Sequence, residues 1–402
     1  MRNTINDDHL DILRKEMENI FHHKISTSTN CDQLSKEIRN KTSQYLSSQT
    51  LRRIFGLVKS TTSPSLFTLD ALSQYCGYQD WNQFCAEKER VSTPSGQTES
   101  LTKWILDFYK VPLPKLWPSP DYFMACKNIA ERIVLDDSLS KTLPSQLATL
   151  PLGQILFFEC FPYIDGLGNG YQKHLKVYLR SKSNNYESQI FANCLLFMGA
   201  YLTENERQIK HYYSIVNSLK CPSPKQIHEI PLGRYMGVQI LYNTHIGNYR
   251  EARSWLEKSL TTCLPDDHIG PGFVNYRFVL SEYLLLTGHY AECVRLLRYM
   301  EDPYWNKFFI TYTVDFEYLD VAKLIRAIAN IRLGNIVIGK NSLKQINQSS
   351  FIFTVSKLYS LFFLHQQLSL CSTDAVKKRT KLVNQINTLV NETRFTYFSV
   401  AS

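Results

Sequence analysis

The sequence predicts an all-α protein in which a small helical head is followed by a longer stack of helical hairpins. Apolar residues recur at helical spacing along most of the 402 residues, and signals of strands are few. A polar stretch over residues 89–100 separates two regions of different character. Beyond this stretch, one glycine-containing pattern occurs three times, each time between two apolar-rich segments.

The composition is that of a folded globular protein, since 44% of the residues are hydrophobic and 13% are aromatic. No apolar run reaches the roughly 18 residues that a membrane span needs. The nearest candidate, residues 351–370, contains Lys357 and His365. Asp7 and Asp8 stand where a signal peptide would need apolar residues. We therefore expect a soluble, cytoplasmic protein that does not enter a membrane.

Residues with reactive or metal-binding side chains form no recognisable catalytic or metal site. The ten cysteines are scattered singly between Cys31 and Cys371, so we expect them to be reduced and mostly to fill core positions. His22 and His23 are neighbours on a predicted helix, so their side chains diverge. The glycine-rich residues 166–170 follow no convincing strand and lack GK[ST], which favours a flexible interhelical loop over a phosphate site. We expect no enzyme activity, no cofactor and no metal.

An opening helix is predicted over residues 6–24. Asn6 or Asp7 can cap its N-terminus, and acidic residues fill its first turn, where they interact favourably with the helix dipole. One apolar stripe would face the core. The stripe comprises Leu10, Leu13, Met17, Ile20 and Phe21.

Two more helices are predicted before residue 60. Leu34 and Ile38 are four residues apart, on one face of the first. Ser47 or Ser48 can cap the second, and Gly56 can end it by taking a left-handed conformation.

In the rest of the head, proline and glycine mark where helices begin and end. Pro64 interrupts the chain, Thr68 can cap a further helix, and Gly77 closes that helix. We expect residues 31–85 to form one compact core. Its members would be Leu34, Ile38, Leu51, Ile54, Phe55, Leu69, Leu72, Trp81 and Phe84.

Basic residues concentrate in one part of the head, although the whole chain carries a net charge of +9. Residues 34–60 contain six basic residues against one acidic residue, and the segments 1–33 and 61–100 both have an acidic excess. A short basic segment between acidic ones focuses a positive potential at one place. The six are Lys36, Arg39, Lys41, Arg52, Arg53 and Lys59.

Over residues 31–85 the order of elements resembles the lambda-repressor-like helix-turn-helix family. Residues 50–54, Gly56, Pro64 with Ser65, and residues 69–72 stand at the places of its recognition helix, the end of that helix and the helix that follows. The resemblance implies DNA binding through the recognition helix. The residues implied are Ser48 and Gln49 at the start of that helix, with Arg52, Arg53 and Lys59 on phosphates or base edges.

A second resemblance is to an N-terminal module of Bacteroidetes proteins. TLRRIFG at residues 50–56, PSLFTLD at 64–70 and GYQDW at 77–81 match the pattern of that module. This resemblance implies the fold and lineage of the head more than its role.

Two functions stay open for the head. It is either the DNA-binding part of a transcriptional regulator or a protein-binding part of a non-enzymatic adaptor. If Arg52 and Arg53 share one exposed positive face with Lys36 and Lys59, the regulator is favoured. If acids such as Asp70 or Asp80 neutralise these arginines, the adaptor is favoured.

The chain is divided by composition into four parts. Residues 1–88 form the helix-turn-helix-like module, and residues 89–100, which contain Pro94 and Gly96, form a linker. Residues 101–190 form a helical connecting region. Residues 191–402 form the helical hairpins.

The repeated pattern is a glycine, a polar residue, a bulky residue, two free positions and a small residue. It occurs at residues 247–252, 288–293 and 334–339, so that the glycines are 41 and 46 residues apart. In a helical hairpin the glycine takes the left-handed turn, the bulky residue plugs the corner, and the small residue lets the two helices approach. A degenerate earlier unit is predicted at residues 191–216.

This pattern resembles tetratricopeptide repeats, which implies a stack of hairpins over residues 190–370 with a concave surface for a peptide or protein partner. In such repeats the first helix of each hairpin lines the groove, which implies that Arg234, Asn275 and Glu282 contact the partner. A homodimer formed through this region is a further arrangement that the resemblance implies. The turn residues with structural roles would be Tyr249, Ala252, Tyr290 and Cys293.

One basic run lies near the C-terminus, at residues 377–381 (KKRTK). Runs of this kind on a helix are usually solvated faces, and we predict no more than that here.

Overall fold

The computed structural model describes residues 7–59, 63–92, 94–111, 120–220, 223, 227–262, 274–298 and 313–400. These residues form α-helices, a π-helical turn and short 3-10 turns, and no β-strand occurs among them. The all-α fold predicted from the apolar spacing is therefore confirmed. The chain divides into two compact units, Met1–Leu101 and Thr102–Ser402.

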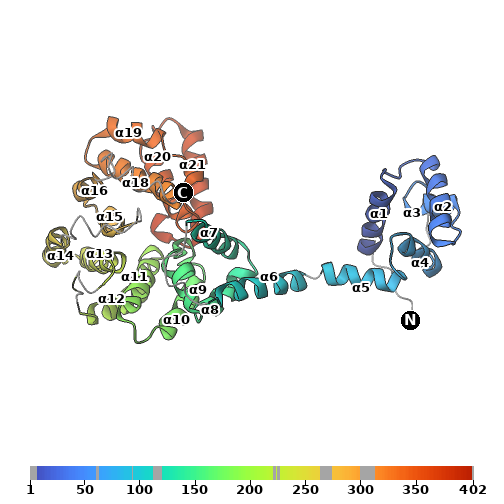
Figure 1. Cartoon of the computed structure of the whole chain (residues 1–402). Helices are drawn as coiled ribbons and strands as arrows, with labels where there is room; N and C mark the ends of the chain where they lie inside the picture. The colour runs from blue at the N-terminus through green and yellow to red at the C-terminus, as the bar shows by residue number, and fades with distance from the viewer. Residues whose placement is uncertain are drawn as a thin grey trace. The chain divides into compact units, whose positions relative to one another are not determined.

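The described residues of unit 1 form five helices and the beginning of a sixth (Figure 1). The helices are α1 (Asp7–Phe21), α2 (Ser28–Thr42), α3 (Ser48–Ile54), α4 (Leu66–Tyr75), α5 (Trp81–Ser92) and α6 (Pro94–Tyr109).

The apolar core of unit 1 is the predicted one. Of the nine residues expected to form it, eight are buried and Phe55 is half-buried. The opening helix contributes as expected, since Leu10, Leu13 and Met17 join the same cluster. Local helical spacing was sufficient here because each short helix buries one face.

Helix α3 of unit 1 begins and ends at the predicted residues, whereas the predicted cap of α4 is wrong. Ser47 caps α3 by accepting a hydrogen bond from the Thr50 backbone N–H, and Gly56 follows α3 in the left-handed region at φ +70°. The cap of α4 is Ser65, not Thr68 as predicted. Thr68 is buried in the first turn, and its N–H donates to the Ser65 hydroxyl at 3.3 Å.

The segment predicted as a linker, residues 89–100, is helical wherever the structure describes it. Residues 89–92 end α5, and residues 94–100 begin α6. The boundary between the units falls after Leu101, inside α6. The polar composition did not predict this helical backbone.

Unit 2 contains the remaining helices (Figure 1). Its first elements are α7 (Pro120–Leu135), α8 (Leu139–Leu147), α9 (Pro151–Gly153), the π-helix η1 (Gln154–Glu159), η2 (Ile164–Gly166) and α10 (Tyr171–Ser181). The next are α11 (Tyr186–Leu202), α12 (Glu206–Ser218), α13 (Glu229–His245), α14 (Tyr249–Thr261), α15 (Tyr276–Leu286) and α16 (Tyr290–Leu296). The last are α18 (Thr313–Arg332), α19 (Ile336–Lys344), η6 (Gln348–Ser350), α20 (Ser356–Ser369), α21 (Val376–Thr393) and η7 (Thr396–Phe398).

The helices of unit 2 pack in sequential pairs, as predicted for a stack of hairpins. The pairs are α11 with α12, α13 with α14, α15 with α16, α18 with α19, and α20 with α21. The first helices also contact one another in order, from α11 through α13 and α15 to α18 and α20. In Figure 1 the second helices α12, α14, α16 and α19 lie along the outer side of this row.

The three predicted hairpin turns are present, although the bulky residue of two of them, Tyr249 and Ile336, is exposed and not buried in the corner as predicted. Gly247 has φ +74°, a conformation that residues with a side chain rarely adopt. Ala252 and Cys293 are buried between the paired helices, as expected. Tyr249, however, is 71% exposed and plugs no corner. It is the first residue of α14, so its side chain extends from the end of the hairpin and not into it.

Elements from both ends of unit 2 meet. Lys127 of α7 is ion-paired with Glu317 of α18, and the Asn169 amide donates to the Glu392 backbone oxygen near the end of α21. Gly168 packs so closely against the Thr393 carbonyl that a side chain would not fit. The glycine-rich residues 166–170 connect η2 and α10, as predicted for an interhelical loop, and Gly168 is held in close packing within it.

The central parts of α11 and α13 are almost completely buried. Every residue from Ile190 to Ala200 in α11 and from Pro231 to Leu241 in α13 is buried. Gly237 lets α13 approach α15, because a Cβ at this position would collide with the Tyr283 ring. The inner row of helices is thus a core of unit 2.

Candidate nucleic-acid interface

Five residues, 43–47, join helices α2 and α3 of unit 1. Helix α2 ends at Thr42, Ser43 adopts the left-handed conformation at φ 57°, and α3 begins after the cap residue Ser47. Glycine is the usual residue at a left-handed turn position. Because Ser43 occupies it here, the sequence between Leu34 and Leu51 gave no glycine by which to place the turn.

Three of the five residues predicted to contact nucleic acid are exposed, and two are half-buried. The exposed ones are Gln49, Arg53 and Lys59, and the half-buried ones are Ser48 and Arg52. Gln49 and Arg53 are four residues apart in α3, so their side chains lie on the same face. Leu51 and Ile54 are buried, which leaves Gln49 and Arg53 on the outer side of the helix.

Arg52 and Arg53 of α3 differ in whether a carboxylate lies beside them. Arg52 forms an ion pair with Asp32 of α2 at 3.2 Å. No carboxylate among the described residues lies within ion-pair distance of Arg53. Asp70 and Asp80 accept hydrogen bonds from backbone N–H groups in the first turn of α5, so neither is paired with an arginine of α3.

An exposed aromatic residue in the turn was missed by the sequence analysis. Tyr45 is 64% exposed, and the Arg39 guanidinium lies 5.9 Å from the centre of its ring. A cation beside an exposed aromatic ring suits contact with phosphate and base together. Basic residues around an aromatic one were visible in the segment RNKTSQY, but they could be assigned to this surface only once the turn was located.

Unit 1 also exposes apolar side chains. Leu66 and Phe67 in the first turn of α4 are each 58% exposed, and Leu57 after α3 is 37% exposed. Single exposed apolar residues are common, but neighbouring ones at a helix start suit contact with another protein.

In unit 2, two of the residues predicted to line a partner groove are buried. Arg234 and Asn275 are 4% and 2% exposed, and Glu282 is half-buried. Asn275 caps α15 by accepting a hydrogen bond from the Phe278 N–H at 3.0 Å. Arg234 and Asn275 therefore present no polar group to a partner, because the first helices of the stack are enclosed by neighbours on both sides.

Arg234 and Glu282 instead belong to one internal polar network. The Arg234 guanidinium lies 5.8 Å from the Phe191 ring and interacts electrostatically with Tyr283 and Glu282. The Tyr359 hydroxyl donates to Glu282 Oε1 at 2.5 Å. Burial raises the pKa of the Glu282 carboxyl, and the Arg234 charge opposes this rise. Helices α11, α13, α15 and α20 all contribute to this network.

A second buried carboxyl holds the two ends of unit 2 together. Asp165 is 2% exposed and accepts backbone hydrogen bonds from Lys357 and Leu358 at 2.7 and 2.9 Å. It thereby caps α20, although it lies about 190 residues away in the chain. Burial raises the pKa of Asp165 to about 7, while these hydrogen bonds favour the charged form. The role is structural.

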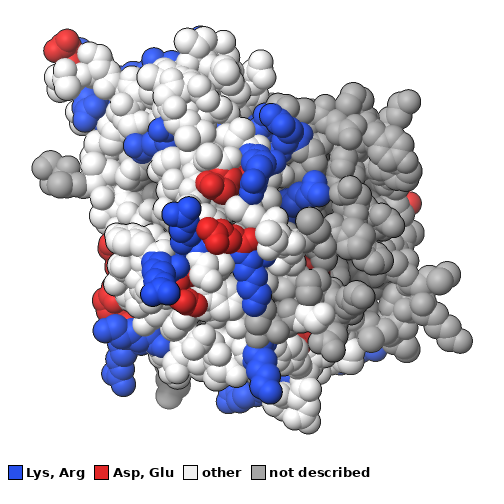
Figure 2. All heavy atoms as spheres, turned by 90° about the vertical axis from the view of Figure 1, so that its left-hand side faces the viewer, with Lys and Arg blue, Asp and Glu red and all other residues white. Residues whose placement is uncertain are grey.

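The surface of unit 2 carries many basic side chains. Figure 2 shows Lys and Arg spread over one face, with Asp and Glu between them. One residue of the predicted basic run is bound within the protein. Arg379 donates hydrogen bonds to the backbone oxygens of Leu368 and Cys371 at the end of α20. Lys378 and Lys381 line a groove of about 550 Å³ between α20, α21 and η6.

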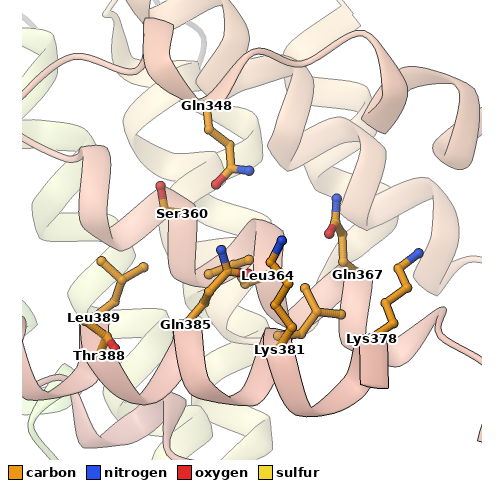
Figure 3. A pocket seen from close by; sticks show the side chains of 10 residues that line it. Gln348, Ser360, Leu364, Gln367, Lys378, Lys381, Gln385, Thr388 and Leu389 are labelled. Atoms are coloured by element: carbon orange, nitrogen blue, oxygen red, sulfur yellow. The ribbon is translucent and has the colours of Figure 1, made fainter. Parts of the chain in front are cut away.

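Figure 3 shows this groove at close range. Lys381 and Gln385 project from α21 into the same space as Gln348, which extends from η6 on the opposite side. Its polar lining consists of amides, hydroxyls and two lysines, and its apolar lining is three leucines.

In the part of the chain that the structure describes, no group of three or more His, Cys, Asp and Glu side chains is arranged to hold a metal ion. No helix of the described residues is long and apolar enough to cross a membrane. No protein-family model, no curated protein and no solved structure matches this chain.

Proposed function

We propose that this chain is a DNA-binding transcriptional regulator, in which unit 1 contacts DNA and unit 2 senses a further molecule or forms a dimer. The observation that carries the proposal is the outer face of α3. It follows a short turn after α2 and presents Gln49 and Arg53 to solvent.

These two side chains suit the edges of bases in the major groove. Arginine forms two hydrogen bonds with guanine, and glutamine forms two with adenine. Arg53 has no competing carboxylate among the described residues, whereas Arg52 is held by Asp32. In this proposal Arg53 reads a base or a phosphate, Arg52 positions α3 against α2, and Lys36, Arg39 and Lys59 add contacts to phosphates.

A salt titration of DNA binding tests the proposal. The full chain is titrated into labelled duplex DNA at increasing salt concentrations, and fluorescence anisotropy gives the affinity. Replacing Arg53 with Ala should weaken binding, and loss of one phosphate contact should reduce the salt slope by about 1. Lys15→Ala, which removes an exposed charge from α1, is the matched control and should leave affinity nearly unchanged.

A second candidate function is a non-enzymatic adaptor in which both units bind protein. Two observations favour it: Asp32 partly neutralises Arg52, and Leu66 and Phe67 are exposed at the start of α4. If wild-type protein binds no DNA or RNA at low salt, the regulator is excluded. Phe67→Ser would then be expected to abolish capture of a protein partner that the wild type retains.

A further inference from the structure

We propose that a groove between α10, α11 and α12 of unit 2 binds a phosphorylated small molecule of nucleotide size. The groove has a volume of about 850 Å³, which is within the range of ligand sites. It lies in unit 2 alone, so the proposal goes beyond DNA binding by unit 1 and does not depend on it.

The groove combines a basic rim with a partly apolar floor. Its rim consists of exposed side chains from α10 and α12, and its floor contains three buried side chains from α11 and α12. The rim comprises Lys176, Arg180, Arg207 and His211, and the buried floor residues are Asn193, Leu196 and Tyr212. Leu179 and Ile215 extend the apolar part.

The basic residues are arranged as two pairs of like residues. Lys176 and Arg180 are four residues apart on α10, and Arg207 and His211 are four residues apart on α12. Lys176 and Arg180 are both cationic, and like charges at this spacing repel each other on a helix. Arg207 also lies in the first turn of α12, where a cation interacts unfavourably with the helix dipole. The unliganded groove is therefore electrostatically unfavourable.

The groove does not compensate these charges itself. None of its lining residues is acidic, and no carboxylate of the described residues forms an ion pair with Lys176, Arg180 or Arg207. Glu206, next to Arg207, is paired with His245 at 2.9 Å. Elsewhere in unit 2 some basic residues have a carboxylate partner, such as Lys182 with Glu159 and Lys357 with Glu392. An anion is the ligand that would relieve this repulsion.

The side chains favour a phosphate over a simple carboxylate. Arginines bind phosphate oxygens through two parallel hydrogen bonds, and Arg180 and Arg207 line the same groove from two different helices, which suits an anion with more oxygens than one carboxylate has. The floor of Leu196, Tyr212 and Ile215 suits the apolar or planar part of the same molecule. A nucleoside diphosphate has both parts.

The groove of Figure 3 serves as the matched control. It is also free of acidic lining residues, but its two cations, Lys378 and Lys381, both lie on α21. It has no arginine and the smaller volume of about 550 Å³. If general positive charge were sufficient for binding, the two grooves would respond alike.

The experiment measures binding of ADP and of inorganic pyrophosphate to the full chain by calorimetry, with thermal unfolding in parallel. We expect ADP to bind and raise Tm, and pyrophosphate to bind more weakly because it lacks the planar part. Arg180→Ala combined with Arg207→Ala should reduce ADP affinity by about tenfold or more. Without ligand, this variant should be at least as stable as the wild type, since both side chains are exposed and their removal relieves the unfavourable charge interactions. Lys378→Ala combined with Lys381→Ala should bind ADP as the wild type does.

Three outcomes would overturn the proposal. The first is the absence of a calorimetric signal and of a Tm change with both ligands in the wild type. The second is an equal loss of affinity in the two double variants, which would indicate unspecific attraction. The third is that the arginine variant loses binding of single-stranded oligonucleotides while its affinity for ADP is unchanged, which would make the groove a nucleic-acid surface.

Discussion

Arg53 and Arg234 were both predicted to meet a partner, and they occupy opposite environments. Arg53 lies on the outer face of α3 in unit 1, exposed and without a carboxylate partner among the described residues. Arg234 lies in α13 of unit 2, where it is 4% exposed and surrounded by Phe191, Tyr283 and Glu282. The two helices differ in how many neighbours they have.

Helix α3 is a short helix at the edge of a five-helix core, so it buries only Leu51 and Ile54. Helix α13 packs against α11, α12, α14 and α15, so no face of its central part reaches solvent. A polar residue on a predicted helix can therefore be assigned to a surface or to the core only when the number of helices packed around that helix is known.

Removing Arg234 should have the largest effect on stability. Arg234→Ala leaves the Glu282 carboxyl without its neighbouring cation and opens a cavity, at a cost of about 3 kcal/mol or more. Chemical denaturation of the full chain measures this, with Arg253→Ala as the control. Arg253 is 81% exposed in an ion pair with Glu257, so its removal should cost at most about 0.5 kcal/mol. Equal costs for the two variants would contradict the internal network.

Truncation of a core residue in unit 1 should have the next largest effect. Leu51 is fully buried, so Leu51→Ala should destabilise unit 1 by about 2–5 kcal/mol. The matched control is Leu57→Ala, since Leu57 is 37% exposed and should contribute much less. Hydrogen exchange read separately over α2 to α4 would locate the loss. Comparable protection in both variants would show that α3 is not part of the core.

A smaller effect should appear as a change in pH dependence. His174 in α10 is 7% exposed, and its Nδ1 lies 2.6 Å from the Ser145 hydroxyl. Burial lowers its pKa below the ordinary 6.5. The unfolded chain then binds the proton more readily, so the contribution of His174 is fully present above pH 6.5 and is lost as the pH falls below it.

The measurement is unfolding free energy from pH 7.5 to 5 for wild type and His174→Gln. The wild type should lose more stability on acidification than the variant, because Gln does not titrate. Ser145→Ala keeps the imidazole and should keep most of the slope. Parallel curves for wild type and His174→Gln would show that this histidine does not become buried in its neutral form.

The smallest expected effect is that of Arg53 on folding. Arg53→Ala should change the free energy of unfolding by no more than about 0.5 kcal/mol, because the side chain is exposed and unpaired among the described residues. Denaturation carried out beside the DNA titration separates folding from binding. A loss of several kcal/mol would mean that Arg53 stabilises the fold, and the comparison with Arg234 would fail.

The sequence by itself determined the all-α fold, the hairpin turns after Gly247, Gly288 and Gly334, and the core of unit 1. Short amphipathic helices such as α1 and α3 show their buried face in their spacing, and Gly56, Gly77 and Gly247 mark helix ends by a conformation that few other residues adopt. These features are local, so a few neighbouring residues suffice to predict them.

Only the tertiary structure decided which polar residues are accessible. Asp165 caps a helix that begins about 190 residues later, and Arg234 meets Tyr283 and Glu282 from the next hairpin. Ser43 occupies a left-handed turn position where glycine is usual. The sequence therefore did not show where the turn between α2 and α3 lies. The sequence did contain one indication that α13 is enclosed. Gly233 and Gly237 are one helical turn apart, and small residues at this spacing indicate that another helix approaches closely. The groove between α10 and α12 could not be predicted from the sequence. Its basic residues come from two helices that are brought together only by the packing of α10, α11 and α12.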